Sequence, residues 1–318
     1  MVGQASNNWV GEMASTPGTV FRNIHFYRLD WGMDDAGRPL TGSLDAALNR
    51  LSKLGFTDGG RYLRQPDGNV YCAWVDSQKS PRKLRFATIR HVGLPLVETS
   101  GVLKDLPISS QEGLYDPVHV VIFSDDIVGV EFNFYGPRAG RLPYYLTTVC
   151  GAPAFEITPL LRQNASRQLR GFDEIRLLDL EIRPNWTEAV TEASPPLGRI
   201  FREAFKVGRP QLARVTLKPE GRRKGFLDRS LLGAVRNLSR RTDLPTGATK
   251  FDVKGRNQVT QALEEVDVLR EHLVSRKAIV KQGVLNRAIN SEDAYRAIAE
   301  AHGEMRDEIA AAAAIASV

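Results

Sequence analysis

The chain has 318 residues, of which 42% are hydrophobic, 25% charged and 8% aromatic, a composition that excludes collagen-like, disordered and disulfide-scaffold proteins. Its formal net charge is +6, and no run of about 20 apolar residues predicts a membrane-spanning helix. The two cysteines, Cys72 and Cys150, have no neighbouring Cys or His at metal-ligand spacing. We therefore expect a cytoplasmic protein of two domains without a membrane partner.

The first half of the chain predicts an antiparallel sheet. Residues 1–18 are rich in Gly, Ser, Asn and Thr without periodicity, so we expect a disordered leader. After it, one helix is expected, where leucines recur at helical spacing between Ser43 and Gly55. Strands are expected at 20–31, 83–90, 118–123 and 127–134, together with a hairpin around Pro66 and Gly68. This pattern indicates a β-rich antiparallel domain over residues 19–150.

From residue 151 the pattern changes to alternating helices and strands. The pair Thr158-Pro159 predicts a helix start, and further helices are expected near 185–207 and over 226–241. Strands are expected at 175–182, 211–217, 250–254 and 273–280. We therefore predict a mixed α/β domain over residues 151–289, with a boundary near residue 150. The whole chain has the α+β fold class.

Residues 290–318 predict one terminal amphipathic helix. Its apolar seam repeats at spacings of three and four, through Tyr295, Ile298, His302, Met305 and Ile309. A helix of this length is marginal alone in water, so its seam must dock on the body of the chain or on a partner. Docking within the chain is the favoured interpretation, and self-association or a protein partner is the alternative.

Positive charge is concentrated in one part of the second domain. Between Arg222 and Arg256, ten basic residues face three acidic ones, so this segment carries +7 and the remaining chain −1. A cluster of fixed cations favours a polyanion, because each neutralised phosphate releases condensed counterions. The predicted nucleic-acid-binding residues are Arg222, Arg223, Lys224, Arg229, Arg236, Arg240, Arg241, Lys250, Lys254 and Arg256.

The helix expected over 226–241 would place several of these charges on one side. At 100° per residue, Leu231, Val235 and Leu238 share one side, while Arg229, Arg236 and Arg240 lie on the opposite side. One side would be buried and the other would present three guanidinium groups, which fork onto phosphate oxygens. No base-reading module surrounds the helix, so we expect contacts to the backbone rather than to bases. A solvated surface or an acidic protein partner would also use such charges, and a protein-interaction subunit without nucleic acid is one alternative.

A metal-dependent nuclease is a second alternative. Asp125, Asp126 and Glu131 could hold Mg²⁺, with Arg138 or Arg141 clamping the scissile phosphate. Against this, Asp is common in turns, and no Lys follows Glu131 at the two-residue spacing of restriction-type nucleases. Alternation also places Glu131 on the outward side of its strand. Outside this alternative, no metal or cofactor is predicted.

Three stretches resemble uncharacterised bacterial proteins associated with defence against phages and plasmids. They are residues 127–138, the pair Lys254-Gly255 and residues 266–270. The resemblance implies a β-rich N-terminal part, a mixed C-terminal part and a nucleic-acid partner, and it transfers no site residues. The function expected from the sequence is a non-catalytic subunit of a bacterial complex that binds nucleic acid, DNA in the first instance.

Overall fold

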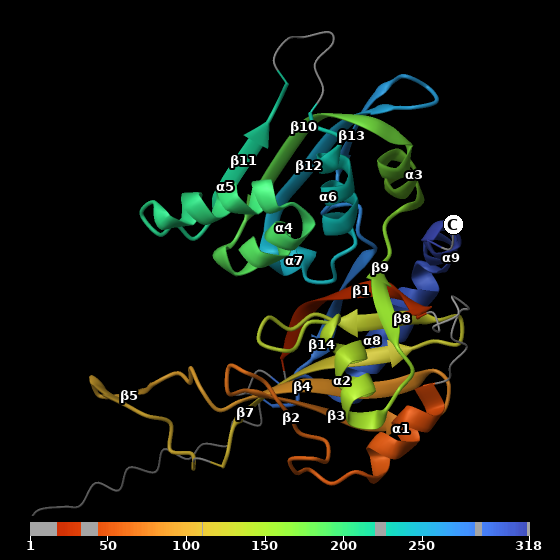
Figure 1. The fold of residues 1–318 in the computed structure, drawn as a ribbon. Coiled ribbons are helices and arrows are strands. Elements are labelled where there is room, and N and C mark those ends of the chain that lie inside the picture. Colours follow the sequence, from red (N-terminus) through yellow and green to blue (C-terminus); the bar gives the residue numbers. More distant parts are fainter. Residues whose placement is uncertain (1–17, 33–43, 110, 220–226, 284–287, 317–318) are drawn as a thin grey trace, which may run out of the picture.

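The computed structural model describes residues 18–32, 44–109, 111–219, 227–283 and 288–316 (Figure 1). Two antiparallel sheets form the framework, one of eight strands and one of four, and helices cover them. The α+β class predicted from the sequence is confirmed. None of the helices within these ranges is long and apolar enough to cross a membrane.

The larger sheet has the strand order β14-β1-β8-β7-β4-β3-β2, and β9 also pairs with β1. Its strands are β1 (Thr19–Trp31), β2 (Leu63–Arg64), β3 (Val70–Ser77), β4 (Arg82–Arg90), β7 (Leu114–Ile122), β8 (Ile127–Glu131), β9 (Phe155–Pro159) and β14 (Val274–Val280). The long β1 holds the sheet together, since it pairs with β8, β9 and β14 along its length. The helix predicted to start at Thr158-Pro159 is wrong, because both residues belong to β9.

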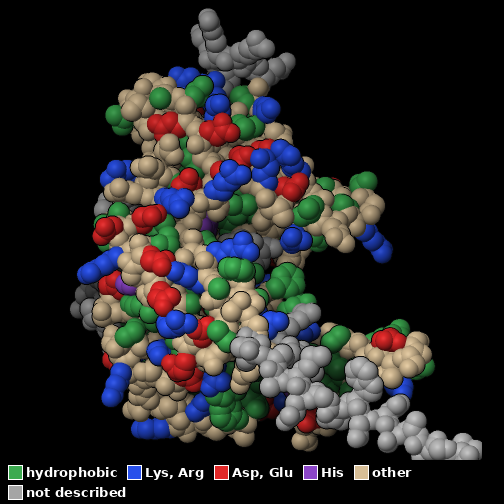
Figure 2. Space-filling view, turned by 180° about the vertical axis from the view of Figure 1, so that it is seen from behind, with side chains coloured by type: hydrophobic (Ala, Val, Ile, Leu, Met, Phe, Trp, Pro, Cys, Tyr) green, Lys and Arg blue, Asp and Glu red, His purple; other side chains and the backbone are tan. Residues whose placement is uncertain are grey.

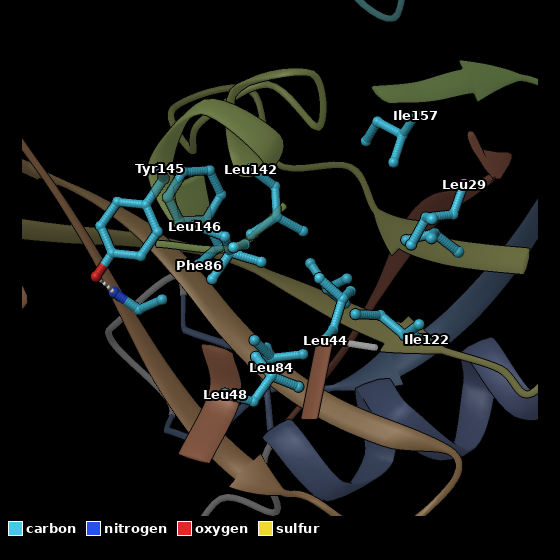
Figure 3. Packing of buried hydrophobic residues seen from close by; sticks show 14 of the residues in the cluster. Leu29, Leu44, Leu48, Leu84, Phe86, Ile122, Leu142, Tyr145, Leu146 and Ile157 are labelled. Atoms are coloured by element: carbon cyan, nitrogen blue, oxygen red, sulfur yellow. Dashed lines mark hydrogen bonds between the residues drawn. The ribbon is translucent and has the colours of Figure 1, made fainter. Parts of the chain in front are cut away.

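Two helices cover each face of this sheet. On one face lie α1 (Leu44–Lys53) and α2 (Arg141–Cys150), whose leucines share a core with Leu84, Phe86 and Val120 (Figure 3). On the other face lie α8 (Ser291–Glu304) and α9 (Arg306–Ala316), which share a separate core with Ile24 and Phe26.

The terminal region therefore forms two helices, which meet at Met305, where a single helix was predicted. The expected seam is present, and Tyr295, Ile298 and Ile309 from it are buried against the larger sheet. His302, also in the seam, stacks on Phe123 with ring centroids 3.8 Å apart. The seam thus docks within the chain.

The hydroxyl of Tyr145 ties α2 to the sheet and gives a stability prediction. Tyr145 is fully buried and donates to the carbonyl of Arg61 at 2.7 Å. Its hydroxyl also accepts from the backbone N–H of Ala73 at 3.1 Å (Figure 3). Tyr145→Phe leaves both backbone groups unpaired, so we expect it to lower the free energy of unfolding by about 1–3 kcal/mol in urea titrations. Tyr144→Phe, at an exposed neighbour on α2, should change it by less than about 0.5 kcal/mol. Equal effects of the two variants would contradict this account.

The smaller sheet has the order β11-β10-β12-β13. Its strands are β10 (Phe172–Ile182), β11 (Ala213–Leu217), β12 (Ala248–Asn257) and β13 (Leu263–Asp267). Helices pack on one face and enclose a second core with Leu178 and Phe251. The helical segments of this half are α3 (Gln163–Gly171), η1 (Pro184–Trp186), α4 (Thr187–Ala193), α5 (Pro195–Lys206), α6 (Ser230–Ser239) and α7 (Leu244–Gly247). A separate hairpin, β5 (Val97–Thr99) and β6 (Val102–Lys104), projects from the larger sheet (Figure 1).

The domain boundary near residue 150 stays a prediction. Most strands before it belong to the larger sheet, and β10 to β13 form the smaller one. However, β9 and β14 come from the later part of the chain and pair with β1. The chain therefore crosses between the two sheets more than once.

Candidate functional site

Helix α6 carries the arginine stripe that the sequence predicts. The helix runs over Ser230–Ser239, with Arg229 and Arg240 as its caps, so it is shorter than the expected 226–241. Val235 and Leu238 are buried in the core of the smaller sheet. In a helix, residues seven and eleven positions apart lie on the same side. Arg236 and Arg240 therefore lie on the same side of α6 as Arg229. Arg222, Arg223 and Lys224 lie outside the described residues.

The predicted cations on β12 lie on the face of the smaller sheet that α6 does not cover. Phe251 and Val253 point into the core that α6 covers, and strand alternation sends their neighbours outward. These outward neighbours are Lys250, Lys254 and Arg256. The sheet therefore separates them from the stripe on α6, and the ten predicted residues do not form one surface.

Carboxylates neutralise these outward cations. Lys250 pairs with Asp252 and lies 3.8 Å from Asp179, Lys254 lies 3.6 Å from Glu265, and Arg256 lies 3.5 Å from Glu174. Figure 2, seen from behind, shows basic side chains beside acidic ones over the upper half of the molecule. Arg241 is also paired, with Glu192 at 2.7 Å and Asp243 at 3.0 Å. An incoming polyanion would have to displace these carboxylates.

Arg236 joins α6 to the end of α3. Its guanidinium donates to the carbonyls of Leu169 at 3.2 Å, Arg170 at 2.9 Å and Phe172 at 3.1 Å, groups that the end of a helix leaves free. Burial lowers the pKa of Arg236, and the neighbouring positive charges of Arg240 and Arg170 lower it further. The guanidinium groups of Arg240 and Arg170 thus both lie close enough to Arg236 to repel it.

A cavity of about 430 Å³ opens beside these arginines. It lies between the two halves of the molecule, where β9, α3, α6 and α9 meet. Its polar lining consists of Arg28, Asp30, Glu156, Thr158, Ser166, Arg170, Arg236, Ser239 and Arg240. Arg28 pairs with Asp30, whereas no carboxylate within the described ranges lies within ion-pair distance of Arg236 or Arg240. Cations therefore exceed carboxylates in this cavity.

The three carboxylates of the nuclease alternative are not brought together. Asp125 and Asp126 form the turn before β8, and Glu131 ends that strand, about 16 Å away at 3.3 Å per residue. Burial raises the pKa of Asp126, and the charge of Asp125 raises it further. Across the described ranges, His, Cys, Asp and Glu side chains form no group of three that could hold a metal ion. The proposed phosphate clamp, Arg138, donates instead to the carbonyls of Asn133 and Phe134.

The outward orientation predicted for Glu131 is wrong. The strand ends at Glu131 rather than at residue 134, and the Glu131 side chain is only 1% exposed. Helix α8 covers this face of the sheet, so the polar residues of β7 and β8 lie beneath a helix rather than in solvent. In contrast, Phe134, predicted to point inward, is 61% exposed.

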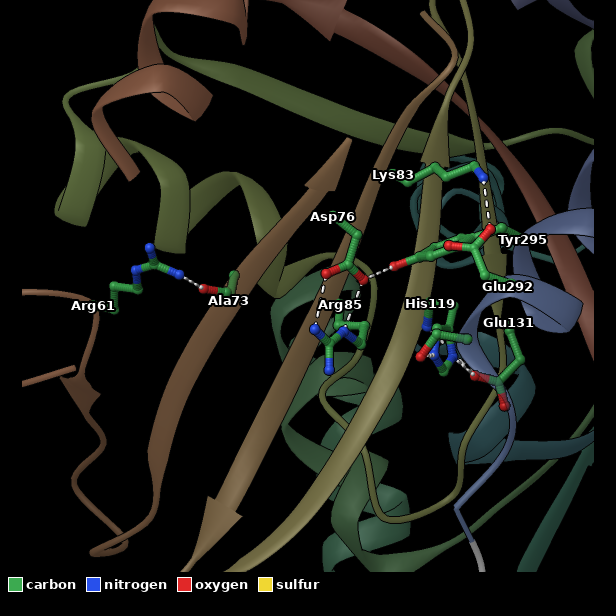
Figure 4. Close-up of polar contacts among 10 residues, drawn as sticks. Arg61, Ala73, Asp76, Lys83, Arg85, His119, Glu131, Glu292 and Tyr295 are labelled. Carbon is green, nitrogen blue, oxygen red and sulfur yellow. Dashed lines mark hydrogen bonds and ion pairs between the residues drawn. The ribbon is translucent and has the colours of Figure 1, made fainter. Parts of the chain in front are cut away.

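A row of polar side chains, buried at His119 and Glu131 and partly exposed at Asp76 and Arg85, lies under the first turns of α8, and the sequence reasoning missed it (Figure 4). His119 lies 3.2 Å from Glu131 and 3.0 Å from the hydroxyl of Ser291. On the neighbouring strands, Asp76 accepts from Arg85 and from the hydroxyl of Tyr295. No local signal reveals this row, because its members lie as far as 219 residues apart.

Comparison with known proteins adds no function. No protein-family model matches this sequence, and no curated protein matches it. The resemblance to defence proteins noted from three short stretches therefore stays an expectation.

Proposed function

We propose that this chain binds nucleic acid through the side of α6 that carries Arg229, Arg236 and Arg240, together with the adjoining cavity. The observation that carries the proposal is the convergence of Arg170, Arg236 and Arg240 at that cavity. DNA is the first ligand to be tested, and the chain acts without cleaving it. As a subunit of a bacterial complex, it would supply the contact with the nucleic acid.

The electrostatics favour a polyanion at this place. Holding like charges close together costs free energy, and a bound phosphate removes that cost while releasing counterions. Guanidinium groups bind phosphate with two parallel hydrogen bonds, which a lysine does not offer. Ser166 and Ser239 in the same lining add hydroxyl donors. The outward face of the smaller sheet is less suitable, because its cations are already paired.

A paired set of variants tests the proposal by titration of labelled single-stranded DNA, duplex DNA and RNA. Arg229→Ala combined with Arg240→Ala removes two cations from the α6 side, and we expect it to weaken binding about 10- to 100-fold at low salt. Lys254→Ala combined with Arg256→Ala removes the same charge from the opposite face of the sheet. This control should change the affinity by less than about twofold.

The other outcomes are equally informative. Equal weakening by both double variants would mean that only net charge matters, and would contradict the proposed site. Absence of DNA and RNA binding at low salt would contradict the proposal and favour a subunit that binds proteins only. Magnesium-dependent cleavage that Asp126→Ala abolishes would favour the nuclease alternative.

A further inference from the structure

Three side chains form a hydrogen-bonded chain at the N-terminal end of α8. Ser291 is the first residue of α8, His119 belongs to β7, and Glu131 ends β8. The Ser291 Oγ atom lies 3.0 Å from Nε2 of His119, and Nδ1 of His119 lies 3.2 Å from Oε2 of Glu131. We propose that Ser291 is the nucleophile of an esterase site, with His119 as its general base and Glu131 as the positioning residue.

The surroundings of Glu131 set the tautomer of His119. The Nε atom of Arg22 lies 3.1 Å from Oε1 of Glu131, so this buried carboxylate has a cationic partner. An ionised carboxylate only accepts hydrogen bonds, and Nδ1 of His119 must therefore carry the proton. Nε2 then presents its lone pair to the Ser291 hydroxyl, as a general base requires.

The imidazole is also held in place. His119 is 1% exposed, and the ring of Tyr295 packs edge-on against it, with centroids 5.4 Å apart. The Tyr295 hydroxyl donates to Asp76 at 2.6 Å, and Asp76 accepts from Arg85 at 2.8 Å (Figure 4). In contrast, Ser291 is only half-buried, so the nucleophile occupies the end of the chain that is nearest to solvent.

The start of α8 provides donors for an oxyanion. The side chain of Asn290 accepts from the backbone N–H of Asp293 at 2.9 Å. In the part of the chain that the structure describes, no acceptor is bonded to the N–H groups of Ser291 and Glu292. Free N–H groups beside a nucleophile at a helix start stabilise the negative oxygen of a tetrahedral intermediate.

A surface hollow lies next to the first turn of α8. Asn290 and Glu292, the residues on either side of Ser291, line a cavity of about 560 Å³ together with Lys83, Val280 and Tyr295. The chain of Ser291, His119 and Glu131 is the arrangement that acyl transfer uses, so we assign a carboxylic ester as the substrate class.

The reaction balances with water as the second substrate. The Ser291 Oγ atom bonds to the ester carbonyl carbon while its proton moves to Nε2 of His119. The tetrahedral intermediate then expels the alcohol, which takes that proton and leaves an acyl-serine. Water attacks the acyl carbon and gives a proton to Nε2, and Ser291 leaves with that proton as the acid is released.

A fluorophosphonate probe tests the nucleophile directly in the full chain. We expect the probe to label Ser291, as located by peptide mass spectrometry, and the protein to hydrolyse p-nitrophenyl acetate or butyrate. Ser291→Ala should abolish both. Ser230 is the matched control, because it is also the first residue of a helix and is exposed, and among the described residues its hydrogen-bond partner is Asp228 rather than a histidine. Ser230→Ala should leave labelling and hydrolysis unchanged.

Variants of the buried partners separate catalysis from folding. Glu131→Gln keeps the side-chain shape and no longer requires the proton on Nδ1, so we expect hydrolysis to fall at least about 100-fold in a protein that retains its circular dichroism spectrum. Absence of labelling in the folded wild type would overturn the proposal. Hydrolysis that survives in Ser291→Ala, or equal labelling of Ser230 and Ser291, would also overturn it. The arginine variants of α6 lie outside this site and should hydrolyse the ester normally.

Discussion

Lowering the pH from 7 to 5 is expected to reduce the free energy of unfolding by about 4 kcal/mol, because two histidines must stay uncharged in the folded protein. Burial lowers the pKa of His25 to about 4. Burial also lowers the pKa of His272 to about 3, and the charge of His25 lowers it further. Both side chains are less than 10% exposed, and His25 lies among the rings of Tyr27 and Phe132.

The sign follows from where the protons bind. In the unfolded chain a histidine takes up its proton near pH 6.5, whereas the folded protein resists it until about pH 4. Between these values the unfolded state binds more protons, so stability falls as the pH falls. Each histidine contributes about 2 kcal/mol of this loss between pH 7 and 5. Carboxylates with lowered pKa values, such as Asp76 and Asp179, lose their contribution to the free energy of unfolding only below pH 5.

Urea titrations at pH 7, 6 and 5 measure this effect. His25→Gln and His272→Gln should each remove about half of the pH dependence, and the double variant should leave little of it. Each variant is compared with itself at different pH values, so any general loss of stability cancels. A double variant that keeps the full pH dependence would show that other groups cause it.

Phe251→Ala is expected to lower the free energy of unfolding by about 3–5 kcal/mol, the second large effect. Phe251 is fully buried in β12 and packs in the core that includes Leu178, Val235 and Leu238. Its removal leaves a cavity between the smaller sheet and α6, and the surrounding backbone can close only part of it. The unfolding midpoint in urea measures the loss.

Val259→Ala is the matched control for Phe251→Ala. Val259 follows β12 in the same hairpin and is 88% exposed, so its truncation should change stability by less than about 0.5 kcal/mol. If the two variants were equally stable, Phe251 would not form the core that separates the two charged surfaces. The division of the predicted cations between the two faces of the sheet would then be wrong.

Alternation and helical spacing account for what the sequence predicted correctly. Leu231, Val235 and Leu238 recur at helical spacing, and the structure places the last two in the core while Arg229 and Arg240 stay exposed. Strand alternation could also have predicted that Lys250 and Lys254 are separated from the arginines of α6. Phe251 alternates with them and must share a core with Val235, so Lys250 and Lys254 have to point away from α6.

Long-range pairing accounts for what the sequence did not show. Local pattern cannot reveal that β9 and β14 pair with the first strand, because strand partners are chosen in three dimensions. The same holds for Glu131, whose position is decided by α8, a helix that begins 160 residues later. Ser291 and His119 meet for this reason alone, and neither carries a local catalytic motif.

The salt dependence of DNA binding tests the central claim most directly. Each phosphate that a cation neutralises adds roughly 0.7 to 0.9 to the slope of log affinity against log salt concentration. Removing Arg229 and Arg240 should therefore reduce the magnitude of the slope by roughly 1.4 to 1.8, while removing Lys254 and Arg256 should leave it unchanged. Equal slopes for the wild type and the Arg229 and Arg240 variant would contradict binding at α6.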